Sequence, residues 1–429
     1  MKPKIAIVGM GYVGLPLARQ FTLAGATVIG LDVDETKVVA LNQGRSYIKH
    51  IPSAEVAAMR GSGRFDASSD FSRVAGVDAI IICVPTPLSK HREPDISFVL
   101  DTGKSIAPYL TPGTLVSLES TTYPGTTDED LRAVLEEGSG KTAGKDFHLA
   151  YSPEREDPGN AKSVHAIPKL VGGFTPACRD RAVEIYSAAI AKIIPVANCR
   201  VAEAAKLTEN IFRSVNIAMV NELKVIFMDM GIDIWEVINA AATKPFGFMP
   251  FYPGPGLGGH CIPIDPFYLT WKAREYGRHT RFIELAGEIN SGMPGYVVFR
   301  VAEALNHKGL PVQGSKVLVL GLAYKPNVDD MRESPAFVLM DMLESRGAEV
   351  SYFDPFIPEI GPTREHAKWT GKRSIAWDRQ ALSSYDAVLI ATDHDEIDYA
   401  VLAEEVDTIV DARNALEKRG ISARNLWKA

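Results

Sequence analysis

The chain has few cysteines: four in 429 residues, at positions 83, 178, 199 and 261. No two of them form a Cys-x-x-Cys pair, which argues against a thiolate zinc site and a thioredoxin-like redox centre. So few thiols in a chain of this length suit a reducing compartment. We therefore predict a cytoplasmic protein without a metal centre.

Long apolar stretches and an excess of positive charge are also absent. No apolar run approaches 18 residues, and the N-terminus lacks the segments of a secretory signal, so we expect no membrane partner. The formal net charge of −7 argues against a general nucleic-acid-binding protein. An anionic small molecule is still a suitable ligand, because a few local lysines and arginines can hold it.

The size and the pattern of the chain indicate several domains. A length of 429 residues with 46% hydrophobic content predicts two or three globular domains, each able to bury a core. The patterns described below divide the chain into an N-terminal domain (1–200), a central helical region (201–310) and a C-terminal domain (311–429).

The N-terminus carries a strand–turn–helix–strand pattern. Residues 5–8 and 27–31 are typical of buried parallel strands, and residues 15–24 of a helix. The turn is Gly9-Met-Gly11-Tyr-Val-Gly14, and Asp32 ends the second strand. This complete unit predicts dinucleotide binding.

Each residue type in this pattern has a physical role. Gly9 makes the tight turn, Gly11 lets a pyrophosphate approach the backbone, and Gly14 allows close helix packing. The helix N-terminus attracts phosphate. Asp32 favours the ribose hydroxyls of NAD over the 2′-phosphate of NADP, and the nearby Lys37 weakens that preference.

The alternation of strands and helices continues, with strands predicted at residues 79–84, 115–118 and 148–151. Thr86, Thr121 and Glu154 follow these strands. Because ligands in open α/β sheets bind at the carboxyl ends of the strands, we expect the three side chains to converge on one crevice. Taken singly, each is equally well explained as a turn or capping residue.

A long helix is predicted from Ala202 to about Met230, where apolar residues recur at helical spacing. It would be ~40 Å long, enough to span a subunit and pack against a second copy. Lys206 and Asn210 are four residues apart and share a face. They form either a solvated polar strip or a clamp for a developing alkoxide.

From Tyr252 to Asp265, glycines and prolines surround a single cysteine, Cys261. The glycines allow close approach of a ligand and the prolines stiffen the segment. A thiol held there suits covalent catalysis, although a buried structural cysteine in a turn is the alternative. The Asp265 carboxylate lies one helical turn from the thiol if a helix begins after Pro263.

The last third of the chain again shows strands, predicted at residues 316–320, 349–353, 387–391 and 408–410. It lacks the full glycine pattern, and its first loop, residues 323–334, is rich in charge. The sequence therefore predicts two Rossmann-like doubly wound α/β domains, joined by a long central helix and a helical dimerisation region.

Six motifs occur in order along the chain: Gly9-Met-Gly11-Tyr-Val-Gly14, Ser120-Thr121, Ser152-Pro-Glu154, Lys206-Leu-Thr-Glu-Asn210, Gly258-Gly-His-Cys261 with Asp265, and Lys325 with Arg332-Glu-Ser. With them the chain resembles the UDP-glucose/GDP-mannose dehydrogenase family over nearly its whole length. The resemblance implies an enzyme that oxidises C6 of a nucleotide sugar to a carboxylate with two NAD molecules.

The resemblance also implies residue roles. The catalytic residues would be Cys261 as nucleophile, Lys206 and Asn210 as the oxyanion clamp, Asp265 as an assistant, Glu154 as base toward the hydrolytic water, and Thr121 as its positioner. The residues in contact with NAD would be Gly9, Gly11, Gly14, Asp32, Thr86, Thr121 and Arg332. The residues in contact with the substrate would be Glu154, Arg155, Lys206, Asn210, Lys244, Phe251, Tyr252, Gly256, Gly258, Lys325 and Arg413.

The implied chemistry explains the need for a thiol. The first oxidation gives an aldehyde, a thiohemiacetal prepares its carbon for the second, and water releases the acid from the resulting thioester. One electrostatic clamp serves both oxidations, and Lys206 would favour the thiolate form of Cys261. Since neighbours in sequence usually point apart, we treat His260 as structural.

Within the family, residues 251–269 and the short segment 154–159 are similar to the UDP-N-acetylglucosamine 6-dehydrogenase branch. Lys244 stands where UDP-glucose dehydrogenases tend to carry a partner-subunit arginine near the sugar, and lysine lacks the bidentate fork of arginine. The predicted substrate is UDP-GlcNAc, with UDP-ManNAc, UDP-GalNAc and UDP-glucose as alternatives. The expected setting is surface polysaccharide biosynthesis, by a homodimer or a higher homo-oligomer.

Two other classes share part of this pattern. A 6-phosphogluconate or β-hydroxyacid dehydrogenase also joins a Rossmann domain to a helix bearing Lys and Asn, but needs neither Cys261 nor a second α/β domain. A non-catalytic NAD-binding protein would keep the glycine turn and could lose the thiol and the clamp.

Overall fold

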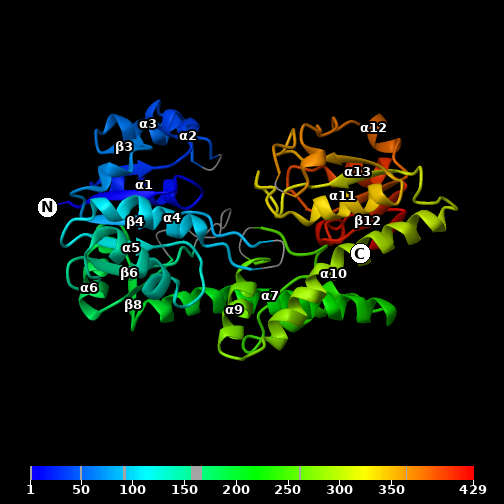
Figure 1. Cartoon of the computed structure of the whole chain (residues 1–429). Helices are drawn as coiled ribbons and strands as arrows, with labels where there is room; N and C mark the ends of the chain where they lie inside the picture. The colour runs from blue at the N-terminus through cyan, green and yellow to red at the C-terminus, as the bar shows by residue number, and fades with distance from the viewer. Residues whose placement is uncertain (1, 49–50, 90–92, 156–166, 260–261, 364) are drawn as a thin grey trace. The chain divides into compact units, whose positions relative to one another are not determined.

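The chain is seen in a computed structural model that describes residues 2–48, 51–89, 93–155, 167–259, 262–363 and 365–429. It divides into two units (Figure 1). One unit comprises the residues up to Glu209 together with Phe267–His279, and the other comprises Asn210–Pro266 together with Thr280–Ala429. The predicted boundaries at residues 200 and 310 stay a prediction. Among the helices of the described part, none is both long and apolar enough to cross a membrane.

The first unit is built on an eight-stranded sheet with the order β3-β2-β1-β4-β5-β6-β7-β8. All neighbouring strands are parallel except β6 and β7, which are antiparallel. The strands are β1 (Lys4–Val8), β2 (Thr27–Leu31), β3 (Phe65–Ser68), β4 (Ala79–Ile82), β5 (Leu115–Leu118), β6 (His148–Tyr151), β7 (Lys169–Gly173) and β8 (Ile193–Val196).

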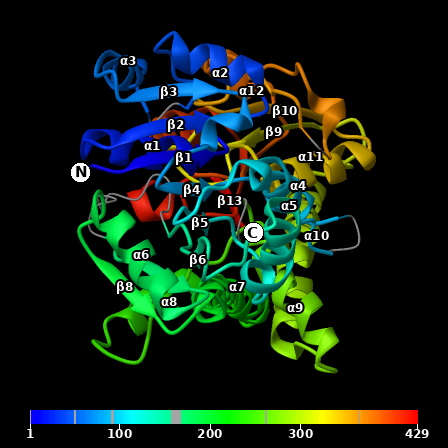
Figure 2. The ribbon, with the colours of Figure 1, turned by 60° about the vertical axis from the view of Figure 1, so that its left-hand side comes forward.

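Helices cover both faces of this sheet. Side chains alternate along β1, so that Ile5 and Ile7 join one apolar cluster while Ala6 and Val8 join another. Helices α1 and α6 pack on the first face and α4 and α5 on the second (Figure 2). The helices are α1 (Gly14–Leu23), α2 (Glu35–Asn42), α3 (Ser53–Gly61), α4 (Ser97–Ile106), α5 (Arg132–Ser139) and α6 (Pro176–Ser187).

The predicted long helix is present as α7, which runs over 31 residues from Cys199 to Asp229. At 1.5 Å per residue it is about 46 Å long. Three more helices follow: α8 (Ile234–Ala242), α9 (Asp265–Glu275) and α10 (Arg281–His307). The Asp233 carboxylate caps α8 by accepting a hydrogen bond from the backbone N–H of Trp235.

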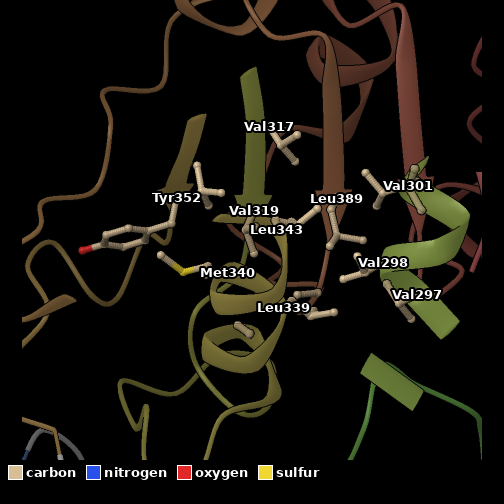
Figure 3. Packing of buried hydrophobic residues seen from close by; sticks show 14 of the residues in the cluster. Val297, Val298, Val301, Val317, Val319, Leu339, Met340, Leu343, Tyr352 and Leu389 are labelled. Carbon is tan, nitrogen blue, oxygen red and sulfur yellow. The ribbon is translucent and has the colours of Figure 1, made fainter. Parts of the chain in front are cut away.

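The second unit contains a five-stranded, fully parallel sheet with the order β10-β9-β11-β12-β13. Its strands are β9 (Lys316–Leu320), β10 (Glu349–Phe353), β11 (Ala387–Ile390), β12 (Thr408–Asp411) and β13 (Asn425–Lys428). Helix α11 (Pro335–Ser345) packs with α10 on one face, where Val317 and Val319 point toward Leu339 and Leu343 (Figure 3). The opposite face is covered by α12 (Arg379–Ser383) and α13 (Tyr399–Glu405). The prediction of two doubly wound α/β domains is confirmed.

Candidate active site

The three glycines of the first turn have different surroundings. Gly9 has a φ of +92°, and a Cβ there would lie 2.6 Å from the carbonyl oxygen of Cys83. A Cβ on Gly14 would collide with the carbonyl of Gly9. A Cβ on Gly11 would meet no atom within 4 Å. Gly9 and Gly14 are therefore needed by the turn itself, and Gly11 borders open space at the N-terminus of α1, where no side chain caps the helix.

The Asp32 carboxylate is held at the end of β2. It is buried, and it accepts hydrogen bonds from the backbone N–H of Met10 at 2.8 Å and of Asp34 at 3.0 Å. Lys37 approaches the same carboxylate at 3.3 Å. An anionic acceptor fixed beside the glycine turn suits the hydroxyls of a ribose and repels a phosphate. The turn and the carboxylate therefore fit NAD.

The difference between Gly11 and Gly14 gives a testable pair of variants. Gly11→Ala should fold with an unchanged Tm and lose NAD affinity by about tenfold or more, because its methyl group would occupy only the space left for the pyrophosphate. Gly14→Ala should lower the Tm, because its methyl group collides with backbone. Thermal unfolding and NAD titration check both. Equal loss of stability in the two variants would contradict this assignment.

Three predicted site residues follow neighbouring strands. Thr86, Thr121 and Glu154 come after β4, β5 and β6, which pair in that order in the sheet. Thr86 is buried, and its carbonyl oxygen accepts a hydrogen bond of 2.5 Å from the Tyr268 hydroxyl. All three residues therefore follow the carboxyl ends of adjacent strands of the first sheet, and their convergence on one crevice stays a prediction.

Glu154 is in contact with a buried ion pair. Lys169, the first residue of β7, places its Nζ 2.9 Å from a carboxylate oxygen of Glu119 and 3.4 Å from one of Glu154. The other Glu119 oxygen accepts a hydrogen bond of 2.7 Å from the Tyr186 hydroxyl. Burial raises the pKa of Glu119, and the Lys169 charge opposes that rise.

Arg155 is engaged by the protein itself. Its guanidinium donates to Glu209 at 2.6 Å and to the carbonyl oxygen of Pro168 at 2.7 Å. Its backbone N–H donates to Glu154 at 2.7 Å. This placement gives Arg155 a structural function beside Glu154.

Asn210 and Asp265 form a buried pair. The side-chain amide of Asn210 donates to Oδ2 of Asp265 at 2.5 Å, and both residues are nearly inaccessible to solvent. Lys206, one turn before Asn210 on α7, is buried as well. The hydrogen bond to Asp265 fixes the plane of the Asn210 amide and leaves its second N–H for another acceptor.

The predicted nucleophile Cys261 and its neighbour His260 lie outside the described residues. Residues 262–264 form a turn, and α9 begins at Asp265 itself. A helix therefore begins after Pro263, and the approach of the Asp265 carboxylate to the thiol stays a prediction. The same carboxylate is held by Asn210, a residue 55 positions earlier in the chain.

The glycines of the loop that precedes Cys261 pack against protein. A side chain on Gly254 would collide with the guanidinium of Arg413, and one on Gly258 would lie 2.8 Å from Tyr324 and from Pro335. From the sequence, these glycines are predicted to let a ligand approach the backbone closely. The structure adds a second reason for them, because a larger residue would displace Arg413 or Tyr324.

The other predicted substrate residues occupy varied positions in the second unit. Phe251 packs edge-on against Phe212 with ring centroids 5.7 Å apart. The hydroxyl of Tyr252 donates to Asn239 at 2.8 Å. The remaining placements are these: Gly256 has a φ of +136°, Lys244 is exposed over the ring of Phe246, and Lys325 lies over the ring of Tyr324. Arg332, which was predicted to contact NAD, is paired with Asp330.

Comparison with known proteins decides the family. Residues 3–190 match the NAD binding domain of the UDP-glucose/GDP-mannose dehydrogenase family, residues 200–292 its central domain, and residues 318–418 its UDP binding domain. The chain belongs to the UDP-glucose/GDP-mannose dehydrogenase family. The cofactor of this dehydrogenase is therefore NAD, as the glycine turn and Asp32 predict.

Individual relatives of the dehydrogenase are similar over more than nine tenths of their length. The chain is 36% identical to the UDP-N-acetyl-D-glucosamine 6-dehydrogenase of Pseudomonas aeruginosa, covering 92% of this chain and 91% of the relative. It is 33% identical to the UDP-N-acetyl-D-mannosamine dehydrogenase of Escherichia coli K12, covering 99% of both chains. The solved structure of UDP-D-ManNAc dehydrogenase from Pyrococcus horikoshii superposes with a TM-score of 0.88 at 30% identity, covering 99% of this chain and 98% of that one.

Sequence reasoning missed four polar residues near the predicted sites. Glu119 and Lys169 form the buried ion pair that contacts Glu154. Asn221 accepts a hydrogen bond of 3.0 Å from the backbone N–H of Gly254. The fourth, Lys224, is described below. The sequence feature that could have identified them is a polar residue within an apolar pattern. Glu119 directly follows a buried strand, and Asn221 lies on the apolar face of α7.

Lys224 of the dehydrogenase is a buried cation on α7. It is fully inaccessible, and its Nζ has no hydrogen-bond partner within the described residues. The rings of Trp235 and Tyr296 lie 5.4 and 5.7 Å from it. Burial, followed by the charge of Arg413, lowers the pKa of Lys224 to about 7.

The burial of Lys224 predicts that the free energy of unfolding depends on pH. Since the pKa is lower in the folded state than in the unfolded state, the unfolded chain binds the extra proton between pH 7 and 10.5, and stability rises with pH over that range. Lys224→Met should be more stable than the wild type at pH 6, and the gap should narrow by on the order of 3–5 kcal/mol by pH 10.

Chemical denaturation at pH 6, 8 and 10 measures that gap. Lys316→Met, which removes an exposed lysine of the same unit, serves as the matched control and should show no such trend. A gap between Lys224→Met and the wild type that is independent of pH would contradict the prediction.

Proposed function

We propose that the protein oxidises C6 of UDP-N-acetylglucosamine to the carboxylate, in two successive NAD-dependent steps. The observation that carries the proposal is the buried hydrogen bond from the Asn210 amide of α7 to Asp265, a residue four positions after Cys261 in the sequence. A fixed donor of this kind stabilises a developing oxyanion without reorganisation. Family membership and the relatives named above support the reaction class.

The protein residues divide the work as follows. Cys261 adds to the C6 aldehyde, and the resulting alkoxide is held by Lys206 and Asn210. NAD, when bound at the glycine turn, supplies the hydride acceptor. After the second oxidation, Glu154 takes a proton from the water that attacks the thioester, and the Cys261 thiolate leaves. The carboxyl group of the product takes its second oxygen from that water.

The N-acetylglucosamine assignment rests on the loop before Cys261. Residues 251–269 have the sequence pattern that resembles the UDP-N-acetylglucosamine 6-dehydrogenase branch, and the Pseudomonas aeruginosa relative carries that name. Relatives named for UDP-N-acetylmannosamine are almost as similar. The gluco configuration therefore belongs to this proposal, and the uronic acid product suits polysaccharide synthesis.

The deciding experiment measures NADH formed per mole of limiting sugar. UDP-GlcNAc is tested beside UDP-ManNAc, UDP-GalNAc and UDP-glucose, and the acid is identified by mass. Two NADH per UDP-GlcNAc, with little from the others, is the expected result. One NADH would mean that oxidation stops at the aldehyde, which removes the role of Cys261. Two NADH from a different sugar would keep the mechanism and overturn the substrate.

We also propose a homodimer or higher homo-oligomer in the cytoplasm. Apolar side chains that suit a contact with a second copy are exposed along α7: Phe212, Met219 and Ile226. The cytoplasmic location rests on the small number of cysteines and stays a prediction.

A further inference from the structure

A buried charge network lies behind Glu154, and the mechanism described above does not use it. The side chain of Lys169 is 7% exposed and that of Glu119 is fully buried, whereas Glu154 is 21% exposed. Lys169 therefore connects a carboxylate in the interior with one at the carboxyl edge of the sheet. The residues come from three elements that are distant in sequence: the end of β5, the segment after β6 and the start of β7.

Within the part of the chain that the structure describes, the ammonium of Lys169 is paired with two carboxylates, those of Glu119 and Glu154. Burial alone would lower the pKa of Lys169, but Glu119 and Glu154 together raise it above its usual range, so Lys169 stays protonated. Glu119 holds this ammonium at 2.9 Å and the Tyr186 hydroxyl at 2.7 Å. Glu154 lies farther from the Lys169 ammonium, at 3.4 Å, so its attraction to that charge is weaker than that of Glu119.

Other described groups also lie close to Glu154. The backbone N–H of Arg155 donates to it, and the guanidinium of Arg155 is paired with Glu209. Cys83, after β4, lies close enough to Glu119, Lys169 and Glu154 to interact with all three, and burial raises the pKa of its thiol. Tyr186 of α6 has its pKa raised by burial and by Glu119. Since both stay neutral, Lys169 is the one buried cation of this group among the described residues.

We propose that Lys169 is a positioning residue that orients Glu154 and keeps it ionised, and that Glu119 limits how much of the Lys169 charge reaches Glu154. The inference rests on the proposed role of Glu154 as base toward the hydrolytic water. A base must be ionised to accept a proton, and a nearby opposite charge favours the ionised form. Glu119 competes for the same ammonium and so moderates that effect.

The two partners of Lys169 predict opposite results on substitution. In Glu119→Gln, the competing charge is gone, so the acid limb of the pH–rate profile for acid formation should move to lower pH by about one unit. In Lys169→Met, Glu154 loses its cation and faces Glu119, so the limb should move to higher pH by a similar amount. If Lys169 and Glu119 only stabilised the fold, both variants would lower the rate, and the acid limbs of their pH–rate profiles would stay at the same pH.

A second measurement separates this inference from the proposed function. Carbon NMR of protein labelled at the glutamate carboxyl, with Glu154→Gln to assign the signal, follows the titration of Glu154 without any substrate. Opposite shifts of that titration in the two variants support the inference even if no sugar of the panel is oxidised. An unmoved or equally shifted titration overturns it even if the enzyme is active.

Folding and net charge are controlled by matched variants. Glu119→Gln keeps the shape of the side chain and can still accept from Lys169, so it tests the proposal alone if Lys169→Met does not fold. Glu184→Gln removes an exposed carboxylate of α6, and Lys104→Met removes an exposed ammonium paired with Asp101. Neither should move the titration of Glu154, and a shift in these controls equal to that in Glu119→Gln would overturn the proposal.

Discussion

Replacing Cys261 by alanine is expected to reduce acid formation by roughly 10³-fold or more, because the second oxidation needs a carbon that carries sulfur. The variant should still bind NAD, since the glycine turn and Asp32 do not involve the thiol. Turnover is measured as NADH and as acid product, and NAD binding by titration. A loss of turnover with unchanged NAD binding would show that the thiol takes part in the reaction and not in cofactor binding.

Cys178→Ala is the matched control for the cysteine variant. Cys178 is a buried cysteine of α6, and its thiol accepts a hydrogen bond from the Thr175 hydroxyl at 3.2 Å. Its replacement should lower stability slightly and leave turnover unchanged. Full acid formation by Cys261→Ala would contradict the covalent mechanism.

The second large effect is expected from Asn210→Asp. Two carboxylates would then face each other in a buried site, so the variant should lose about 2–4 kcal/mol of stability. Acid formation should fall by roughly 10²–10³-fold, because a carboxylate replaces an oxyanion donor. Denaturation and steady-state kinetics measure the two losses separately.

The exchanged double variant Asn210→Asp with Asp265→Asn separates folding from catalysis. It restores a hydrogen bond between the two positions, so most of the stability should return. Activity should stay low, because the α7 position now presents a carboxylate to the oxyanion. Asn216→Asp, on the same helix and outside the pair, is the control for the chemical change. Recovery of activity in the exchanged variant would contradict the role of Asn210 as donor.

The strands that sequence reasoning missed share a physical cause. β3 has the sequence Phe-Asp-Ala-Ser, β7 ends in two glycines, β8 contains a proline, and β13 begins and ends with a polar residue. They become strands because a neighbouring strand supplies the hydrogen bonds. The strands that were predicted contain runs of buried, mostly apolar residues, as in Ile5–Val8 of β1 and in the whole of β4.

By itself, the sequence determined the cofactor turn, the long helix α7 and most strands of the two largely parallel sheets. Each of these depends on residues close together in the chain, where glycine spacing and apolar periodicity act directly on the backbone. The tertiary structure alone decided which polar groups share a site. Lys169 meets Glu119 across 50 positions, and Asn210 meets Asp265 across 55. Such pairs depend on the order of strands and the direction of helices, which no local pattern specifies.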